Sequence, residues 1–290
     1  MLLRIFFVLL MIGSLTAPVD AGWFESITSY FSKPAPAKPP KLRVLIVNDE
    51  QGVVIEVKGK YKIYDPHNGE HISTRFVGKR KFMQAVRDGI KWGEEFPGLY
   101  QLMIVPDETS TTTIVDGIEY RGPIFVYDIG GTISVMNEVP VQDYLSSILA
   151  QRYKQTMPGE FLAAVAIAAR TNAYYAAANP KNQYWSVDAR AVNYQGFAVV
   201  DPTSDMERAV RDTRYMVMSS TASGENQIST FPAEWKTDAS NSGLPYISKI
   251  TLEEALDMAN QGDHAAQILG KAFPGTKIEL ISYPAETSKK

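Results

Sequence analysis

Between residues 139 and 180, apolar residues follow two helical patterns that are separated by a short polar connector. The first pattern covers residues 141–149, the connector 151–157, and the second pattern begins at Pro158 and stops at Asn179 and Pro180. The second pattern is apolar on nearly all sides, which is typical of a helix that is buried on most of its surface. We therefore predict that this helix is the spine of the main folded part of the chain.

Upstream of this stretch, residues 42–136 show the short patterns that are typical of β-strands. The predicted strands cover residues 43–47, 52–57, 61–64, 101–106, 117–120, 124–127 and 132–137. Residues 65–69 have the composition of a turn, and Gly130 with Gly131 predicts a hairpin turn between the last two strands. Residues 79–92 are interpreted either as a helix or as an insertion.

Downstream, the patterns predict helices over residues 206–214, 251–260 and 264–272. Thr251 and Glu254 have the spacing of a capping box. Strands are predicted at residues 215–219 and 226–231, on either side of a turn, and at 277–281, whereas residues 185–200 are expected to be extended or irregular. The sequence thus predicts an α+β fold in which a largely β N-terminal part precedes a mixed helical and β part.

The N-terminal region has the composition of segments that precede a folded domain. Arg4, the apolar run over residues 5–15 and the small residues around Asp20 predict a signal peptide over residues 1–21. The alternative, a transmembrane anchor, needs an apolar run of ~20 residues, and this run is shorter. We expect an aromatic arm and proline-rich linker over residues 22–41, a β-rich subdomain over 42–136, a core over 137–282, and a disordered tail over 283–290.

Composition narrows the chemistry that the chain can carry out. Its 290 residues have a net charge of −3 and include no cysteine and only three histidines, His67, His71 and His264. The charge gives no reason to expect nucleic acid as a partner, and the lack of cysteine excludes disulfides, thiol catalysis and thiolate metal sites. A histidine-based zinc site would need nearly all three histidines, so we expect no metal and no cofactor. Export to the periplasm or cell envelope favours hydrolysis, transglycosylation or wall binding.

Several motifs resemble, in the right order, those of the SpoIID/LytB domain family. They are N-E-V-P-V-Q-D-Y-L at residues 137–145, A-A-V-A-I-A-A-R-T-N-A at 163–173, the segment from Asp188 to Gly196, A-V-R-D-T at 209–213, and a closing block from 258 to 276. The resemblance implies a SpoIID-like core with a glycan cleft and implies peptidoglycan as the substrate. In the family, sporulation-type members are lytic transglycosylases that act on glycan strands stripped of peptides, whereas LytB-type members enhance a partner amidase.

The chain departs from the family at the catalytic position. The family's general acid is a Glu in an S-E-M-P connector, 18 residues before the Arg of A-A-R-T, and counting back from Arg170 reaches Arg152. An arginine cannot serve as a general acid near neutral pH. The family's H-x-S-S-G-G and G-H-G-x-G-M-S-Q segments are also replaced, by residues 231–243 and 244–251. The scaffold motifs therefore remain while three pieces of the expected cleft have changed.

Other carboxylates are weak candidates for the missing acid. They are Glu160 and Glu234, with Asp188 as a further possibility. Glu160 also fits a structural role, because a carboxylate in the first turn of a helix is favoured by the helix dipole. The sequence therefore does not identify the catalytic residue.

The candidates for contacting substrate are basic or aromatic residues. They are Arg152, Tyr153, Lys154, Arg170, Tyr194 and Trp235. The three connector residues either hold sugar hydroxyls and muramyl carboxylates or form a solvated loop. Arg170 lies in an apolar helix, where a guanidinium needs a partner, so it is interpreted mainly as a brace. The two aromatic residues either stack on sugars or belong to the core or its rim. His264 is expected at the surface.

Three hypotheses follow for function. The first is an exported lytic transglycosylase-like protein whose acid comes from elsewhere in the chain. The second is a non-catalytic peptidoglycan-binding module that positions or stimulates a partner wall hydrolase. The third, a scaffold without glycan contact, fits the motifs least well. Expected partners are peptidoglycan glycan strands and a wall amidase or division protein.

Overall fold

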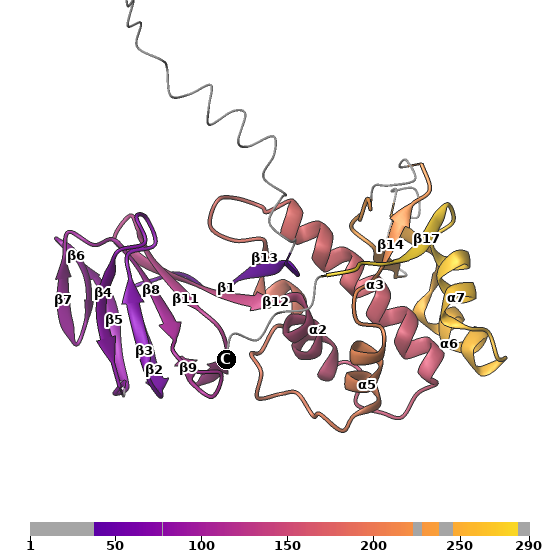
Figure 1. The fold of residues 1–290 in the computed structure, drawn as a ribbon, viewed down its shortest axis with the longest axis horizontal. Coiled ribbons are helices and arrows are strands. Elements are labelled where there is room, and N and C mark those ends of the chain that lie inside the picture. Colours follow the sequence, from indigo (N-terminus) through magenta and orange to yellow (C-terminus); the bar gives the residue numbers. More distant parts are fainter. Residues whose placement is uncertain (1–37, 77, 223–227, 238–245, 284–290) are drawn as a thin grey trace, which may run out of the picture. The chain divides into compact units, whose positions relative to one another are not determined.

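The structure is a computed structural model, and it describes residues 38–76, 78–222, 228–237 and 246–283. The predicted signal peptide, the aromatic arm and the predicted tail beyond Tyr283 lie outside the described residues. Figure 1 shows the elements in chain order, and residues 39–283 form a single unit.

Seven strands form the first sheet, in the order β13-β1-β12-β11-β8-β3-β4. Their bounds are β1 (Lys41–Glu50), β3 (Tyr61–Tyr64), β4 (His71–Arg75), β8 (Gln101–Pro106), β11 (Ile124–Ile129), β12 (Thr132–Pro140) and β13 (Val187–Asp188). Gly130 and Gly131 form the predicted hairpin turn between β11 and β12, with φ of 68° and 91° that glycine adopts readily. The predicted subdomain boundary at residue 136 lies within β12, and the division into subdomains stays a prediction.

Six strands form the second sheet, in the order β10-β9-β2-β5-β6-β7. Their bounds are β2 (Gly52–Lys58), β5 (Lys81–Val86), β6 (Gly89–Trp92), β7 (Glu94–Pro97), β9 (Thr112–Val115) and β10 (Ile118–Tyr120). The interpretation of residues 79–92 as a helix is wrong, because residues 81–92 form the β5–β6 hairpin, and the alternative that the segment is an insertion stays a prediction. β5 pairs with β2, for example Met83 with Val53, and this pairing stabilises the strand. Strand preference depends on such neighbours, which the local sequence does not contain.

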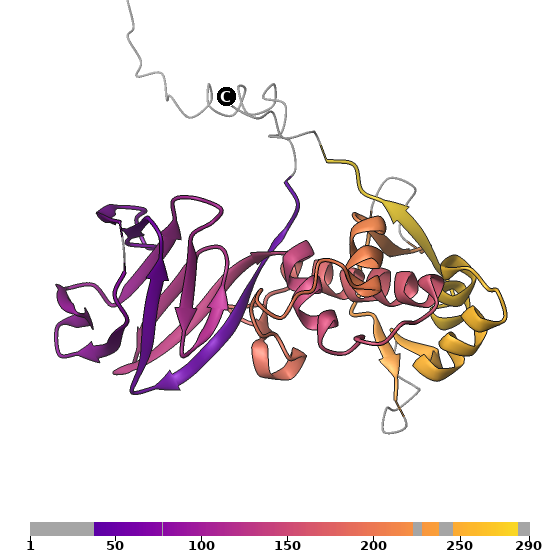
Figure 2. The same cartoon turned by 90° about the horizontal axis from the view of Figure 1, so that it is seen from below.

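The described residues include six helices (Figure 1). They are α2 (Val141–Ala150), α3 (Gly159–Ala178), α4 (Ala189–Val192), α5 (Asp205–Asp212), α6 (Leu252–Asn260) and α7 (Ala265–Ala272). The predicted spine is confirmed, because α3 contacts α2, α5, α6, α7 and β14, and ten of its twenty residues are buried (Figure 2). Pro158 is the N-cap of α3 rather than its first helical residue. The capping box of Thr251 and Glu254 is confirmed at the start of α6.

Two small sheets complete the described elements. β14 (Met216–Ser220) pairs antiparallel with β17 (Thr276–Leu280), and β15 (Glu234–Lys236) pairs parallel with β16 (Ile247–Thr251). The predicted strand at residues 215–219 is confirmed as β14, whereas the predicted strand at 226–231 is wrong for the described residues 228–231, although Ser229 still hydrogen-bonds to Ser219 and Ser220. The partner of β14 is β17, a strand from the far end of the chain, and residues 228–231 are not a strand.

One hydrophobic core joins the two large sheets to the helices. It includes Leu42 and Ile104 of the first sheet, Ile55 of the second, and Leu145 and Ile167 of α2 and α3. A smaller cluster of Leu45, Phe125, Tyr127 and Met136 lies on the other face of the first sheet, with Tyr184 and Trp185 packed against it. The helical part is therefore built directly onto the sheet rather than attached by a linker.

Candidate functional site

The connector between α2 and α3 places its two basic side chains in solvent. The backbone N–H groups of Arg152 and Tyr153 both donate to the carbonyl of Leu149, at 3.1 Å each, which continues the turn of α2. Tyr153 is buried and packs edge-on against Phe161, with 6.0 Å between ring centroids. Arg152 and Lys154, on either side of it, are exposed. The connector is thus anchored by Tyr153, which has little surface to offer a substrate, and presents Arg152 and Lys154.

Arg170 is buried to 1% exposure and braces α3 against the end of α5. Its Nη1 donates to the carbonyl oxygen of Thr213 at 2.7 Å and to the Thr213 hydroxyl at 3.1 Å, and its Nη2 donates to the carbonyl oxygen of Val210 at 2.8 Å. Burial lowers the pKa of Arg170 from its usual 12.5 to about 10, so it remains a cation at neutral pH. The brace interpretation fits this geometry, and the assignment of Arg170 to substrate binding does not, because no substrate can reach its guanidinium.

Tyr194 is also an internal residue. It is 5% exposed, and its hydroxyl donates to Oδ1 of Asn137 at 2.6 Å, while Nδ2 of Asn137 donates to the carbonyls of Arg121 and Pro123. Burial raises the pKa of Tyr194, so its hydroxyl keeps its proton. Two segments that the sequence analysis matched to the family, around Asn137 and around Tyr194, therefore meet in one buried hydrogen-bond network. Tyr194 does not offer its ring to a sugar.

Glu160 holds the beginning of α7. Its Oε2 accepts a hydrogen bond from the backbone N–H of Ala265 at 2.8 Å, and its Oε1 lies 3.9 Å from Nδ1 of His264. A carboxylate at this position offsets the unpaired N–H groups of a helix N-terminus. His264 is exposed, as predicted. Glu160 thus has a structural contact that the sequence analysis did not foresee, in addition to its place in the first turn of α3.

Glu234 and Trp235 belong to an aromatic group at the other end of α7. Trp235 packs edge-on against Phe273, the residue that follows α7, at 5.6 Å between ring centroids. Its buried Nε1 has no hydrogen-bond partner among the described residues, and Glu234 beside it is exposed. An eight-residue helix is about 12 Å long. Glu160 contacts the beginning of α7, whereas Glu234 is the neighbour of Trp235, which contacts the residue after its end, so the two carboxylates do not form a pair around one glycosidic bond.

The third weak candidate, Asp188, caps a helix. Its Oδ1 accepts a hydrogen bond from the backbone N–H of Arg190 at 2.8 Å, as the N-cap of α4. Asn193 ends this one-turn helix in the left-handed conformation, with φ of 56°. The sequence analysis had expected extended or irregular backbone here and missed the short helix.

Asp143, in the first turn of α2, is a residue that the sequence analysis did not consider as an acid. Asp143 is exposed, and partial desolvation by its neighbours raises the pKa of its carboxyl group, while the nearby guanidinium groups of Arg121 and Arg214 oppose that rise. Those arginines are held by aromatic rings, Arg121 over Phe197 at 4.1 Å and Arg214 over Tyr215 at 4.7 Å. Among the described carboxyl groups, Asp143 alone has a clearly raised pKa. The sequence places it in the 137–145 motif but contains no signal of its desolvation.

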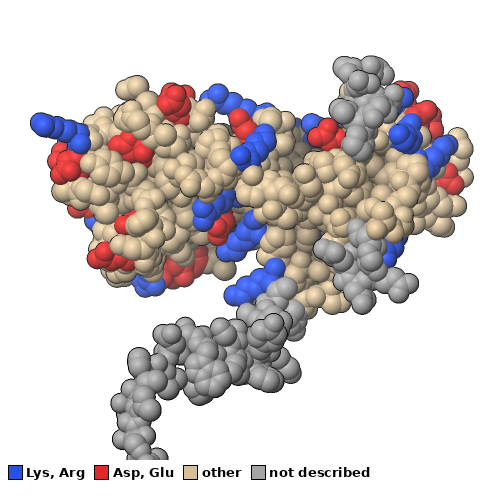
Figure 3. Space-filling model, turned by 90° about the horizontal axis from the view of Figure 1, so that it is seen from above, with Lys and Arg blue, Asp and Glu red and all other residues tan. Residues whose placement is uncertain are grey.

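The described part of the chain contains no group of three or more His, Asp or Glu side chains that could hold a metal ion. On the face shown in Figure 3, Lys and Arg side chains are interspersed with Asp and Glu and separated by uncharged surface. None of the helices among the described residues combines the length and apolar character needed to cross a membrane.

Comparison with known proteins identifies the family to which this site belongs. The family model described as "SpoIID: Stage II sporulation protein" matches residues 130–219, which include α2, α3, α4 and α5. No solved structure matches the chain.

Three bacterial relatives illustrate the range of similarity, and each is described as an uncharacterized protein. One from Chlamydia pneumoniae is 35% identical over 199 residues, which cover 67% of this chain and 71% of the relative. One from Chlamydia muridarum is 28% identical over 245 residues, covering 83% of this chain and 78% of the relative. One from Brachyspira hyodysenteriae is 30% identical over 178 residues, covering 61% and 47%. The SpoIID domain indicates a cell-wall-related role, and the chain belongs to the SpoIID family.

Proposed function

We propose that this protein is exported to the cell envelope, binds the glycan strands of peptidoglycan, and positions or stimulates a partner wall hydrolase without cleaving the strands itself. The partner is a wall amidase or a division protein. The proposal makes the cell-wall-related role of the family more specific and adopts the non-catalytic hypothesis from the sequence analysis.

One observation carries the proposal: an exposed arginine stands where the resemblance implies the catalytic Glu. Arg152 follows the end of α2, 18 residues before Arg170, as the family's Glu does. Arg170 itself forms its hydrogen bonds to Thr213, so the scaffold at this position is retained. A guanidinium stays charged at neutral pH and cannot protonate a glycosidic oxygen. It can, however, hold a carboxylate with two parallel hydrogen bonds. Arg152 with Lys154 is therefore suited to bind the muramyl carboxylates of a glycan strand and unsuited to cut it.

A second candidate function, lytic transglycosylase activity, is favoured by one specific observation. The reaction needs a carboxylic acid that is protonated near neutral pH, which enzymes obtain by desolvation. In this chain, partial desolvation raises the pKa of Asp143, an exposed carboxyl group that accepts no hydrogen bond from another described residue. Asp143 replaces Glu160, Glu234 and Asp188 as the first residue to test, because Glu160 and Asp188 accept hydrogen bonds from helix N-termini.

A single assay separates the two functions. The full chain is incubated with peptide-stripped glycan strands, and the products are searched by mass spectrometry for anhydro-muramyl ends while binding is followed by pull-down. We expect pull-down without product. Product formation that Asp143→Asn abolishes, while Glu160→Gln and Glu234→Gln retain it, establishes the transglycosylase instead. Failure to bind either stripped or peptide-bearing wall overturns both functions.

A further inference from the structure

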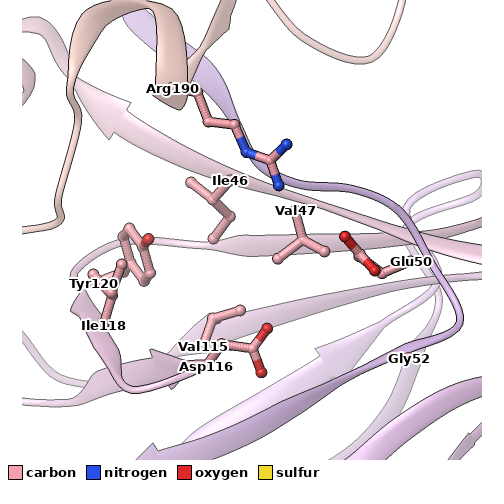
Figure 4. A pocket seen from close by; sticks show the side chains of 9 residues that line it. All are labelled: Ile46, Val47, Glu50, Gly52, Val115, Asp116, Ile118, Tyr120 and Arg190. Atoms are coloured by element: carbon pink, nitrogen blue, oxygen red, sulfur yellow. The ribbon is translucent and has the colours of Figure 1, made fainter.

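A cavity of about 170 Å³, partly open to solvent, lies beside β1 where the two large sheets separate (Figure 4). One wall is the end of β1 and the start of β2, a second is the turn and strand of the β9–β10 hairpin, and α4 contributes Arg190. This volume is below the roughly 300–1,000 Å³ of sites for drug-sized ligands, so the cavity suits a compact molecule or the end group of a larger one. The cavity contains none of the residues assigned above to glycan binding or to the candidate acids.

Two charged groups of opposite sign border the cavity without a partner. Arg190 and Glu50 are exposed, and neither side chain forms an ion pair or hydrogen bond with another described residue. Figure 4 shows both reaching toward the same space. Asp116 adds a second carboxylate, whose Oδ1 accepts a hydrogen bond from the backbone N–H of Val54 at 2.9 Å, which fixes its position and leaves Oδ2 available.

The hydroxyl of a largely buried tyrosine adds a neutral polar group to the cavity. Tyr120 is 3% exposed, yet its hydroxyl makes no hydrogen bond with the described residues, and Figure 4 shows it directed into the cavity. Its ring lies against that of Tyr194, at 5.9 Å between centroids, so the hydroxyl cannot turn freely to solvent. The hydroxyl oxygen is not one of the fully buried unpaired atoms of the described residues, so it reaches the solvent in the cavity and can contact a ligand there. Burial also raises the pKa of Tyr120, so the group is a neutral donor and acceptor.

The rest of the lining is apolar. Ile46 and Val47 of β1 face Val115 and Ile118 across the cavity. A site with one guanidinium, two carboxylates, a neutral hydroxyl and an apolar floor complements a compact molecule that carries both charges. A phosphate or sulfate would be repelled by Glu50 and Asp116, and a simple cation would be repelled by Arg190.

We propose that this cavity binds an amino-carboxylate group, that is, a carbon bearing both an ammonium and a carboxylate. Arg190 holds the carboxylate, Glu50 and Asp116 hold the ammonium, and the hydroxyl of Tyr120 donates to the carboxylate. Such a group has two sources: a free amino acid, or a peptide whose diamino dicarboxylic residue ends its side chain in this way. Wall peptides are one place where the second source occurs, so the site would let a glycan-binding protein sense attached peptides.

The test titrates the full-length protein with defined probes by isothermal calorimetry and by NMR of the ¹⁵N-labelled chain. The probes are meso-diaminopimelate, a tripeptide that ends in it, and D- and L-alanine, with N-acetyl-alanine and alanine amide as controls that each lack one charge. We expect binding of at least one amino-carboxylate probe, with shifts at the amides of residues 46–52 and 115–120, and no binding of the two controls. Binding of the tripeptide but not of alanine identifies a peptide source, and binding of alanine identifies a free amino acid.

Variants then assign the binding to the cavity. Arg190→Gln and Glu50→Gln should each weaken binding at least tenfold, and Tyr120→Phe, which keeps the buried ring, should weaken it several-fold. Arg80→Gln, an exposed arginine outside the cavity, serves as the matched control and should bind normally. Circular dichroism and thermal unfolding confirm that each variant is folded. The proposal is overturned if no amino-carboxylate probe binds, if the single-charge controls bind as well, or if Arg190→Gln and Glu50→Gln bind like Arg80→Gln. In that case the two charges simply form a surface ion pair in solution.

Discussion

Nη1 of Arg170 donates to the backbone carbonyl oxygen of Thr213 over 2.7 Å, with both groups buried. Arg170 lies within the motif at residues 163–173 of α3, and Thr213 ends the motif at residues 209–213, most of which lies in α5. The bond therefore joins two segments that resemble the SpoIID family and explains why a charged residue lies in the middle of the apolar spine. Its role is to terminate α5, because the guanidinium takes the place of the next helical N–H groups.

The first prediction concerns this brace. Arg170→Met keeps the length of the side chain but removes the donor of four hydrogen bonds, although the carbonyls of Val210 and Thr213 keep those from Gln142 and Met216. Hydrogen bonds to a charged group contribute about 1.5–3 kcal/mol each, and relief of the buried charge offsets part of their loss, so we expect a destabilisation of about 2–4 kcal/mol. Urea unfolding measures it. Arg211→Met, on the exposed side of α5, is the control and should stay within about 0.5 kcal/mol. Equal stability of the two variants would show that Arg170 is not a brace.

The second prediction separates structure from substrate binding at Tyr194. Tyr194→Phe removes the hydroxyl that donates to Asn137 and leaves a buried acceptor, so we expect a destabilisation of about 1–2 kcal/mol. Pull-down by stripped glycan strands should be unchanged under conditions where the variant is folded, because the ring is inaccessible. Tyr175→Phe, whose hydroxyl has no partner among the described residues, is the control and should leave stability unaffected. Loss of glycan binding without loss of stability would restore Tyr194 to the binding site.

The sequence predicted elements well where the signal is local. The apolar period of α3, the capping box of Thr251 and the Gly130–Gly131 turn each depend on residues within a few positions, and all three are confirmed. The failures at residues 79–92 and 226–231 involve strands whose pairing partners lie elsewhere in the chain.

The features of the candidate site also differ in whether the local sequence could predict them. The exposed connector and the buried Arg170 were interpretable from composition and periodicity. The contact of Glu160 with Ala265 spans 105 residues, and the desolvation of Asp143 depends on surroundings from several segments. The burial of Tyr194 was one of two alternatives, because an aromatic residue suits both a core and a sugar. The burial of Tyr153 was neither of the alternatives given for the connector, which were sugar contact and a solvated loop. No sequence pattern marked the cavity of Arg190 and Glu50, whose walls come from three distant segments.

The third prediction is a pH dependence at Asp107. Nζ of Lys60 and of Lys62 lie 2.7 and 2.8 Å from its carboxylate oxygens, and these contacts lower its pKa from 3.8 to about 2. The unfolded chain binds a proton at this group at higher pH than the folded chain does. Its contribution to stability is therefore present above about pH 4 and is lost as the pH falls toward 2.

Two measurements check this. NMR titration of the Asp107 carboxyl should give a midpoint near 2, and Asp107→Asn should flatten the fall in thermal stability between pH 4 and 2, relative to the unmodified chain. Asp88→Asn, at an exposed carboxylate without an ion pair in the described residues, should leave that slope unchanged. A normal midpoint for Asp107 would mean that the two lysines do not hold it in solution.

The fourth prediction tests whether the connector contacts glycan. Arg152→Gln and Lys154→Gln remove the two exposed charges while keeping polar side chains of similar reach, and Tyr153 keeps the backbone anchored between them. If they bind muramyl carboxylates, the double variant should bind stripped glycan strands at least tenfold more weakly, which corresponds to about 1.4 kcal/mol. Binding of the unmodified chain should also weaken with added salt, because exposed charge pairs are screened.

The matched control for this experiment is Arg80→Gln, which removes an exposed charge from β-rich surface far along the chain from the connector. It should bind strands as the unmodified chain does. The double variant should also keep its stability, since neither exposed side chain contributes to the core. Undiminished binding by the double variant would mean that glycan strands bind to another surface of the protein. Arg152 would then replace the catalytic Glu of the family without taking part in glycan binding.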